Sequence, residues 1–217
     1  MFNTPFPPYV HFVLLREEDT VGAQLHSCEE ALLPYGATVK RRREFRLGRL
    51  AARNALAAID VDAPVLRSVN RSPIWPSGVV GSISRAAGIG IAAVSRYRDV
   101  IGVGLDVEDV TRQLDSNAAS LIADPTEQCW IGGSSSRLIH LLSAKEAVFK
   151  AFAPIFVNPF TMLSIHLTPM CNHFITRLNY QDTLGFSVGM CWKVNCDIRY
   201  PLIMSSVVVS HNPMEIL

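Results

Sequence analysis

The stretch "GVGLDVED", residues 102–109, places three carboxylates within four positions, directly after an apolar run. We expect it to be a strand, because it follows that run without interruption. Side chains alternate between the two faces of a strand, so Asp106 and Glu108 share one face and Asp109 points to the other. Two neighbouring carboxylates repel each other. The pair is therefore either the solvated end of a surface strand or part of a Mg²⁺ site, which typically uses one or two carboxylates, waters and substrate phosphates.

A second informative stretch is "SAKEAVFKA", residues 143–151, inside a helix that we predict over residues 137–153 and that Pro154 ends. Lys145 falls within the apolar stripe of this helix. Its amine must therefore either reach water along the stem or meet an anion. Glu146 and Lys150 lie together at i, i+4, which is typical of an ordinary surface pair. Alternatively, Glu146 is a third carboxylate beside Asp106 and Glu108.

Basic residues recur on the other helix that the sequence predicts clearly, residues 39–59. Arg46, Arg49 and Arg53 form an arc beside its apolar stripe. The arc is either a solvated face or a phosphate-binding surface, since guanidinium groups match phosphate oxygens bidentately. Arg71, in a proline-punctuated loop, and Arg85, after "GSIS", would extend such a surface. The sequence contains neither a P-loop nor a dinucleotide-binding glycine pattern.

The order of predicted elements indicates an α+β fold built as a pseudo-dimer of two similar α/β halves. The helix at 39–59 precedes apolar, strand-like runs at 78–84, 88–96 and 100–108. The helix at 137–153 precedes similar runs at 162–168, 183–194 and 202–210. A further strand is expected at 10–15, and "GGSSS", residues 132–136 at the end of the polar segment 111–136, is expected to be a flexible crossing. We place the N-terminal half at residues 1–110 and the C-terminal half at 111–217.

Composition narrows the class of protein. The 217 residues are 49% hydrophobic and 18% charged, as in a folded globule, and the net charge of +1 gives no overall field for nucleic acid. The five cysteines form no C-x-x-C pair, which favours reduced thiols in the cytoplasm. The first ten residues lack a signal-peptide pattern, and no apolar run is long enough to span a membrane. We expect a cytoplasmic monomer without nucleic-acid or membrane partners.

Four stretches together resemble the 4'-phosphopantetheinyl transferases of the Sfp type, and especially the subgroup associated with enterobactin and other siderophores. They are "RRREFRLGRLAARNAL", "RSPIWPSGVVGSIS", "GVGLDVE" and "SAKEAVFKA", which occur in this order within residues 38–153. The resemblance implies Mg²⁺-dependent transfer of the 4'-phosphopantetheine arm of coenzyme A to a serine of an apo acyl or peptidyl carrier protein. The by-product is adenosine 3',5'-bisphosphate. It also implies two similar halves with a cleft between them.

The resemblance also assigns expected roles to residues. Asp106, Glu108 and Glu146 would hold Mg²⁺, with Glu146 either completing the metal shell or accepting the serine proton. Lys150 would meet the pyrophosphate, so Glu146 and Lys150 are the expected catalytic pair. The family usually has histidine at the position of Arg85, which keeps the positive charge. The residues expected to bind coenzyme A are Arg49, Arg53, Arg71, Ser84, Arg85, Lys145 and Lys150.

Two other functions fit parts of the sequence. One is a non-catalytic homologue that binds coenzyme A or a carrier protein, which Arg85 alone favours. The other is a metal-dependent nuclease, because clustered carboxylates and a lysine serve phosphodiester cleavage and a row of arginines can follow a nucleic-acid backbone. The near-zero net charge and the absence of interleaved aromatic residues count against the nuclease.

Overall fold

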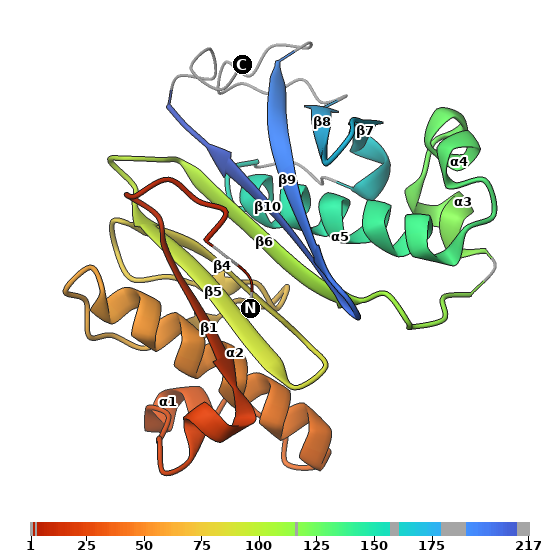
Figure 1. Ribbon diagram of the computed structural model, residues 1–217. Helices are drawn as coiled ribbons and strands as arrows, with labels where there is room; N and C mark the ends of the chain where they lie inside the picture. Colours follow the sequence, from red (N-terminus) through yellow and green to blue (C-terminus); the bar gives the residue numbers. More distant parts are fainter. Residues whose placement is uncertain (1, 3, 116, 157–160, 179–189, 212–217) are drawn as a thin grey trace.

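A computed structural model describes residues 2–211 other than 3, 116, 157–160 and 179–189. These residues form two main antiparallel sheets, each carrying one long helix (Figure 1). The first sheet has the order β1-β5-β4 and consists of β1 (His11–Arg16), β4 (Val79–Ala86) and β5 (Ile89–Arg96). The second has the order β6-β10-β9-β8-β7. Its strands are β6 (Gly102–Asp109), β7 (Ile165–Pro169), β8 (His173–Leu178), β9 (Cys191–Arg199) and β10 (Leu202–Val209).

Shorter elements connect these layers. Before the long helix α2 (Val39–Ala57) lie η1 (Glu17–Thr20) and α1 (Ser27–Glu30), and after it a small hairpin of β2 (Leu66–Arg67) and β3 (Pro73–Ile74). Between β6 and the long helix α5 (Ser135–Phe152), the chain forms α3 (Ala118–Ile122) and α4 (Pro125–Ile131), and η2 (Met162–Ser164) leads into β7. No helix in the described part of the chain is long and apolar enough to cross a membrane.

Helix α2 (Val39–Ala57) covers the N-terminal sheet. The Thr38 hydroxyl accepts a hydrogen bond from the Arg41 amide and so satisfies one of the free N–H groups at the start of the helix. Its fully buried Ala52 and Leu56 pack with Ala92 and Val94 of β5. The apolar stripe read from the sequence is therefore the core-facing side, which leaves the residues beside it free to line the edge of the sheet.

Helix α5 (Ser135–Phe152) covers the C-terminal sheet. Ser134 caps its start by accepting from the Arg137 amide. The buried Leu141, Val148 and Phe152 belong to the core that this helix shares with β7–β10. Phe152 stands edge-on to Trp192 of β9, with 4.8 Å between the ring centroids. Such contacts fix the rotational orientation of the helix about its axis. They therefore determine which of its residues face β6.

The glycines of β6 bring α5 close to that strand. A Cβ atom on Gly104 would lie 1.9 Å from the Ala147 carbonyl oxygen, and one on Gly102 would lie 2.5 Å from that of Ala151. Every second residue of a strand lies on the same face, so Gly102 and Gly104 share a face with Asp106 and Glu108. The same face of β6 therefore first admits the helix backbone and then presents carboxylates beside it.

Strands β4 and β6 lie side by side although they belong to different sheets. The Ser82 hydroxyl donates to the Leu105 carbonyl oxygen and accepts from the Leu105 amide, at 3.3 and 3.0 Å. Ser84 accepts in the same way from the Val107 amide, at 3.3 Å. Two serine side chains of β4 thus bind the backbone of β6 and join the two sheets.

The α+β fold expected from the sequence is confirmed, as are both long helices, to within two residues at each end. The run at 78–84, the run at 88–96 and the carboxylate-bearing run are all strands. The polar segment 111–136 contains α3 and α4, and the "GGSSS" expected as a crossing runs into the start of α5 at Ser135. The predicted strand at 183–194 lies partly outside the described residues, and β8 was not predicted. Strand β6 pairs with β10 although it falls within 1–110, so the division at 110/111 stays a prediction.

Candidate active site

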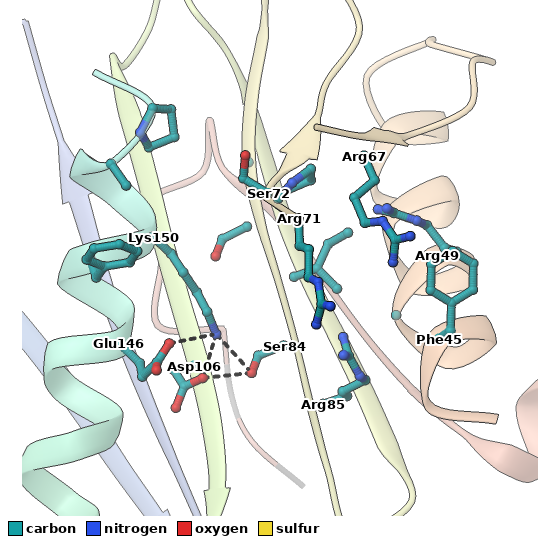
Figure 2. Close-up of a pocket in the computed structure, with 18 of the residues that line it drawn as sticks. Phe45, Arg49, Arg67, Arg71, Ser72, Ser84, Arg85, Asp106, Glu146 and Lys150 are labelled. Carbon is teal, nitrogen blue, oxygen red and sulfur yellow. Dashed lines mark hydrogen bonds and ion pairs between the residues drawn. The ribbon is translucent and has the colours of Figure 1, made fainter. Parts of the chain in front are cut away.

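A pocket of about 690 Å³ lies between the two halves. Its walls come from α2, the β2–β3 hairpin, β4, β6 and α5. Figure 2 shows acidic side chains with Lys150 on one side of this pocket and several arginines on the other. The carboxylates that we call the acidic cluster are Asp106, Glu108 and Glu146. The residues that we call the arginine cluster are Arg41, Arg49, Arg67, Arg71 and Arg85.

Asp106 is the most deeply buried member of the acidic cluster, with 3% of its surface exposed. Its Oδ1 accepts hydrogen bonds from Lys150 Nζ at 2.6 Å and from the Ser84 hydroxyl at 2.8 Å. Among the described residues, its Oδ2 is buried without a hydrogen-bond partner. A buried carboxylate oxygen without a partner is costly, so this atom offers a free ligand position to a cation.

Glu108 and Glu146 surround Asp106 in the same pocket. Burial raises the pKa of Glu108, the Asp106 charge raises it further, and Arg112, at 3.2 Å, opposes this. Burial also raises the pKa of Glu146, while Lys150, at 3.9 Å, lowers it and Asp106 raises it. Both carboxylates are thus held where their negative charge is poorly compensated.

The acidic cluster fits a divalent cation, on the strength of the free Asp106 oxygen and the raised pKa of its two neighbours. Carboxylate oxygens are the ligands that Mg²⁺ prefers. The three side chains come from β6 and α5, which the β6 glycines hold together. The family resemblance assigned these three residues to Mg²⁺, a role that stays a prediction, and the structure brings all three into one pocket.

Lys145 does not line this pocket. Its side chain is fully buried and its ammonium lies 2.6 Å from Glu127 of α4, which is also fully buried. It donates further to the carbonyl oxygens of Ile122 and Met162. The amine therefore meets an anion, which was one of the two alternatives read from the sequence. This placement does not support the expectation that Lys145 binds coenzyme A, because its ammonium is paired with Glu127 inside the protein and does not reach the pocket.

Glu127 also belongs to a group of possible metal ligands. Its ligand atoms lie within 4.8 Å of those of Asp124 and His166. Glu127 already accepts from Lys145, from the Leu167 amide and from the Asp124 amide. The ammonium of Lys145 thus supplies the positive charge at this place, and the group ties α4, α5 and β7 together.

Arg49 is the most buried member of the arginine cluster, with 6% of its surface exposed. Its Nη2 donates to the Leu66 carbonyl oxygen at 3.2 Å, and among the described residues its buried Nε has no partner. Burial lowers the pKa of Arg49 to about 10, and the charges of Arg85 and Arg67 add to this against the opposing charge of Glu29. Crowded guanidinium groups of this kind favour an incoming anion.

Arg71 and Arg85 lie across the pocket from the acidic cluster. Figure 2 shows their guanidinium groups directed toward one another. Arg71 has a positive φ of 70°, in the turn between β2 and β3. Burial and the Arg41 charge lower the pKa of Arg85, while Glu44 raises it. Both residues were expected to bind phosphate, and both line the pocket.

Arg53 lies outside the pocket, in contrast to Arg49 one turn earlier on α2. Its Nη1 donates to the Gln24 carbonyl oxygen, and Arg46 donates to that of Ala23. These arginines hold the loop after η1. Sequence reasoning also missed Arg41 and Arg67, which do line the pocket. The "RRRE" run that contains Arg41 was a visible signal, whereas Arg67 becomes relevant only when the hairpin folds over the site.

Two family models match the chain in succession. The 4'-phosphopantetheinyl transferase N-terminal domain matches residues 29–95, and the 4'-phosphopantetheinyl transferase superfamily matches residues 102–194. The chain belongs to the 4'-phosphopantetheinyl transferase superfamily. The arginine cluster lies entirely within the first matched region. The acidic cluster and Lys150 lie within the second, so the pocket of this superfamily member combines both.

Curated relatives agree with this assignment. The chain is 37% identical over 134 residues to the 4'-phosphopantetheinyl transferase Svp of Streptomyces mobaraensis, covering 58% of this chain and 54% of the relative. It is 36% identical to PptT of Mycobacterium tuberculosis, covering 64% and 66%. It is 35% identical to enterobactin synthase component D of Salmonella typhi, covering 60% and 61%. The chain thus spans between half and two thirds of the length of these relatives.

Among solved structures, the holo-acyl-carrier-protein synthase of Helicobacter pylori in complex with coenzyme A matches with a TM-score of 0.38 at 17% identity. That match covers 50% of this chain and 99% of the other. The corresponding synthase of Thermotoga maritima matches with a TM-score of 0.40 at 19% identity, covering 52% and 65%.

Proposed function

We propose that this chain transfers the 4'-phosphopantetheine arm of coenzyme A to a serine of an apo acyl or peptidyl carrier protein and releases adenosine 3',5'-bisphosphate. The observation that carries the proposal is the charge separation within one pocket between the halves. The acidic cluster, in which Asp106 has a free buried oxygen, lies at one end of the pocket, and the arginine cluster lies at the other. Coenzyme A has a matching layout, with a pyrophosphate that binds metal and a separate 3'-phosphate.

Asp106, Glu108 and Glu146 would hold Mg²⁺ in this proposal. Bound Mg²⁺ supplies charge neutralisation at the pyrophosphate, which makes it a better leaving group. Lys150 would turn its ammonium toward the same pyrophosphate, since its partly exposed side chain already reaches into the pocket. Phosphoryl chemistry depends mainly on positioning and on charge, so the pocket does not require a protein nucleophile.

Glu146 is also placed to accept the proton of the attacking serine. Its raised pKa, caused by burial, makes it a stronger base than an exposed glutamate. It lies on the α5 wall of the pocket, beside Lys150. Whether Glu146 serves as metal ligand or as base, its carboxylate is needed. We therefore propose that Glu146 and Lys150 are the catalytic pair.

Arg49, Arg71 and Arg85 would bind the 3'-phosphate of coenzyme A. Arginine presents paired donors that match a phosphate bidentately. Arg41 and Arg67 line the same end and would add positive charge. Ser84 would act from between the two clusters, where its hydroxyl already contacts Asp106. In this arrangement Arg85 replaces the usual histidine as an adapted phosphate ligand.

The proposed setting is siderophore or other secondary-metabolite synthesis in the cytoplasm, by a monomer. The relative from Salmonella typhi, enterobactin synthase component D, supports the siderophore part. None of the five cysteines, all of which lie in the described part of the chain, forms a disulfide, and this supports a reducing compartment. The carrier protein itself is expected to present its serine at the mouth of the pocket, beside the acidic cluster.

Intact-mass spectrometry tests the proposed transfer. The purified chain is incubated with coenzyme A, Mg²⁺ and apo carrier proteins from peptide synthetases, polyketide synthases and fatty-acid synthesis. We expect a mass gain of one phosphopantetheine arm on at least one carrier, and no gain when EDTA removes the metal. No gain on any carrier, with coenzyme A binding intact, would instead identify a non-catalytic binding protein.

A further inference from the structure

Glu44 of α2 is an acidic residue that lines the pocket but lies outside the acidic cluster. Its Oε2 lies 3.9 Å from Arg85 Nε, and its Oε1 lies 3.9 Å from Lys40 Nζ. One third of its side chain is exposed, so it stands at the edge of the arginine cluster. A negative group in this position is unexpected, because the surrounding residues would attract a phosphate.

The distance between Glu44 and Arg85 distinguishes two possible roles. A carboxylate that orients an arginine normally does so through bidentate hydrogen bonds of about 2.7–2.9 Å. At 3.9 Å, Glu44 contributes charge to Arg85 but does not fix its geometry. Arg85 also feels the positive charge of Arg41, and the Glu44 charge offsets it. Glu44 is thus the local anion of the ligand-free pocket.

We propose that Glu44 is a specificity-determining residue that competes with a ligand phosphate for Arg85. It lowers the affinity of the arginine end for a phosphomonoester and speeds the release of adenosine 3',5'-bisphosphate. This inference rests on the proposed function, because it assigns the 3'-phosphate of coenzyme A and of the product to this end of the pocket. Like charges repel across a partly desolvated pocket more strongly than in water.

Isothermal titration calorimetry on the Glu44→Gln variant tests this role. The substitution keeps the side-chain size and removes the charge. We expect adenosine 3',5'-bisphosphate to bind roughly two- to fivefold more tightly, as for a partly exposed charge interaction. Its dissociation rate should fall by a similar factor. The affinity for dephospho-coenzyme A, which lacks the 3'-phosphate, should change less. The gain in affinity for the bisphosphate should become smaller at high salt.

Glu30→Gln is the matched control. It changes the net charge equally, and Glu30 is exposed on α1 and outside the pocket lining. Weaker binding by Glu44→Gln would show that Glu44 orients Arg85, and an equal gain in Glu30→Gln would show a net-charge effect. Either result overturns the proposal.

The same measurements separate this inference from the proposed function. If the unsubstituted chain binds the bisphosphate and modifies carriers, but Glu44→Gln binds no more tightly, only the inference fails. If the unsubstituted chain binds the bisphosphate and Glu44→Gln binds it more tightly, but no carrier gains mass, only the transfer fails. If the unsubstituted chain binds neither coenzyme A nor the bisphosphate, both fail.

Discussion

Lys150 Nζ lies 2.6 Å from Asp106 Oδ1, although 44 residues separate the two in the sequence. The lysine comes from α5 and the aspartate from β6. The same ammonium lies 3.3 Å from the Ser84 hydroxyl of β4 and so touches the other sheet as well. In the ligand-free pocket, Lys150 therefore partly neutralises the carboxylate that we propose for the metal.

Asp106→Asn tests the acidic cluster with little change of shape. Asparagine keeps the size of the side chain but removes the charge that a divalent cation needs. We expect carrier modification to fall by about 100-fold or more, because losing even an outer partner of a metal ligand costs 10–100-fold. Stabilisation by Mg²⁺ in a thermal-shift assay should also be lost. Asp109→Asn is the control, since the Asp109 carboxylate accepts hydrogen bonds from the Thr111 amide and hydroxyl and does not line the pocket. Equal losses in both variants would contradict the assignment.

Gly104→Ala should push α5 away from β6. The added methyl group would meet the Ala147 carbonyl oxygen at 1.9 Å, and a backbone atom cannot rotate aside. We expect a loss of about 1–3 kcal/mol in the free energy of unfolding, as for other overpacked sites. Transfer activity should fall further than stability explains, because Glu146 moves relative to Asp106. Urea unfolding and carrier modification measure the two effects.

Gly36→Ala is the matched control for that variant, because an added Cβ there meets nothing within 4 Å. It should leave both stability and transfer nearly unchanged. A Gly104→Ala protein with normal stability and normal activity would mean that the close approach of the helix is not needed.

Lys145→Met tests the buried ion pair that joins α5 to Glu127 of α4. Methionine fills similar space but leaves the Glu127 carboxylate buried without its cation. Breaking such a pair typically costs about 3–5 kcal/mol, and we expect a loss of that size in urea unfolding. Adding Glu127→Gln to the same chain removes the stranded charge and should recover part of the loss. A single variant as stable as the original chain would rule out the pair as a structural support.

His140→Phe tests a pH effect far from the pocket. The imidazole stands edge-on to Trp130 and Phe174, and burial lowers its pKa below the ordinary 6.5. The unfolded chain therefore binds a proton at a higher pH than the native protein does. The contribution of His140 to the free energy of unfolding is therefore fully present above pH 6.5. It is lost as the pH falls from 6.5 through the lowered pKa of the native protein. Phenylalanine should flatten this decline, measured as urea midpoints at several pH values.

His173→Phe makes the same substitution on β8, at an imidazole that bonds the neighbouring Asn172 instead of packing among aromatic rings. It should leave the acid-side slope in place. If the two variants show the same slope as the original chain, His140 does not cause the acid sensitivity.

Local spacing explains which parts of the site could be read from the sequence. Asp106 and Glu108 share a face because a strand alternates, and Glu146 and Lys150 share a flank because a helix repeats every 3.6 residues. Both relations hold in the structure, and the pocket contains all four side chains. The glycine spacing in β6 carried a further signal, the close approach of α5, which becomes evident only with the helix in place.

Long-range relations explain what the sequence did not reveal. Lys145 meets Glu127, 18 residues earlier, in a segment whose polar composition concealed two short helices. Arg53 follows Arg49 by one helical turn, but the pocket ends between them, and helical periodicity cannot locate that end. Arg67 reaches the pocket through the β2–β3 hairpin, whose Leu66 carbonyl oxygen accepts a hydrogen bond from Arg49 of α2.

The serine contacts between β4 and β6 have a consequence for how this cleft can evolve. Backbone ladders are common to every sequence and resist change, whereas Ser82 and Ser84 can each be replaced by one mutation. The connection between β4 and β6 therefore depends on individual side chains. We therefore expect a substitution of either serine to change the spacing of the two sheets while each sheet stays intact.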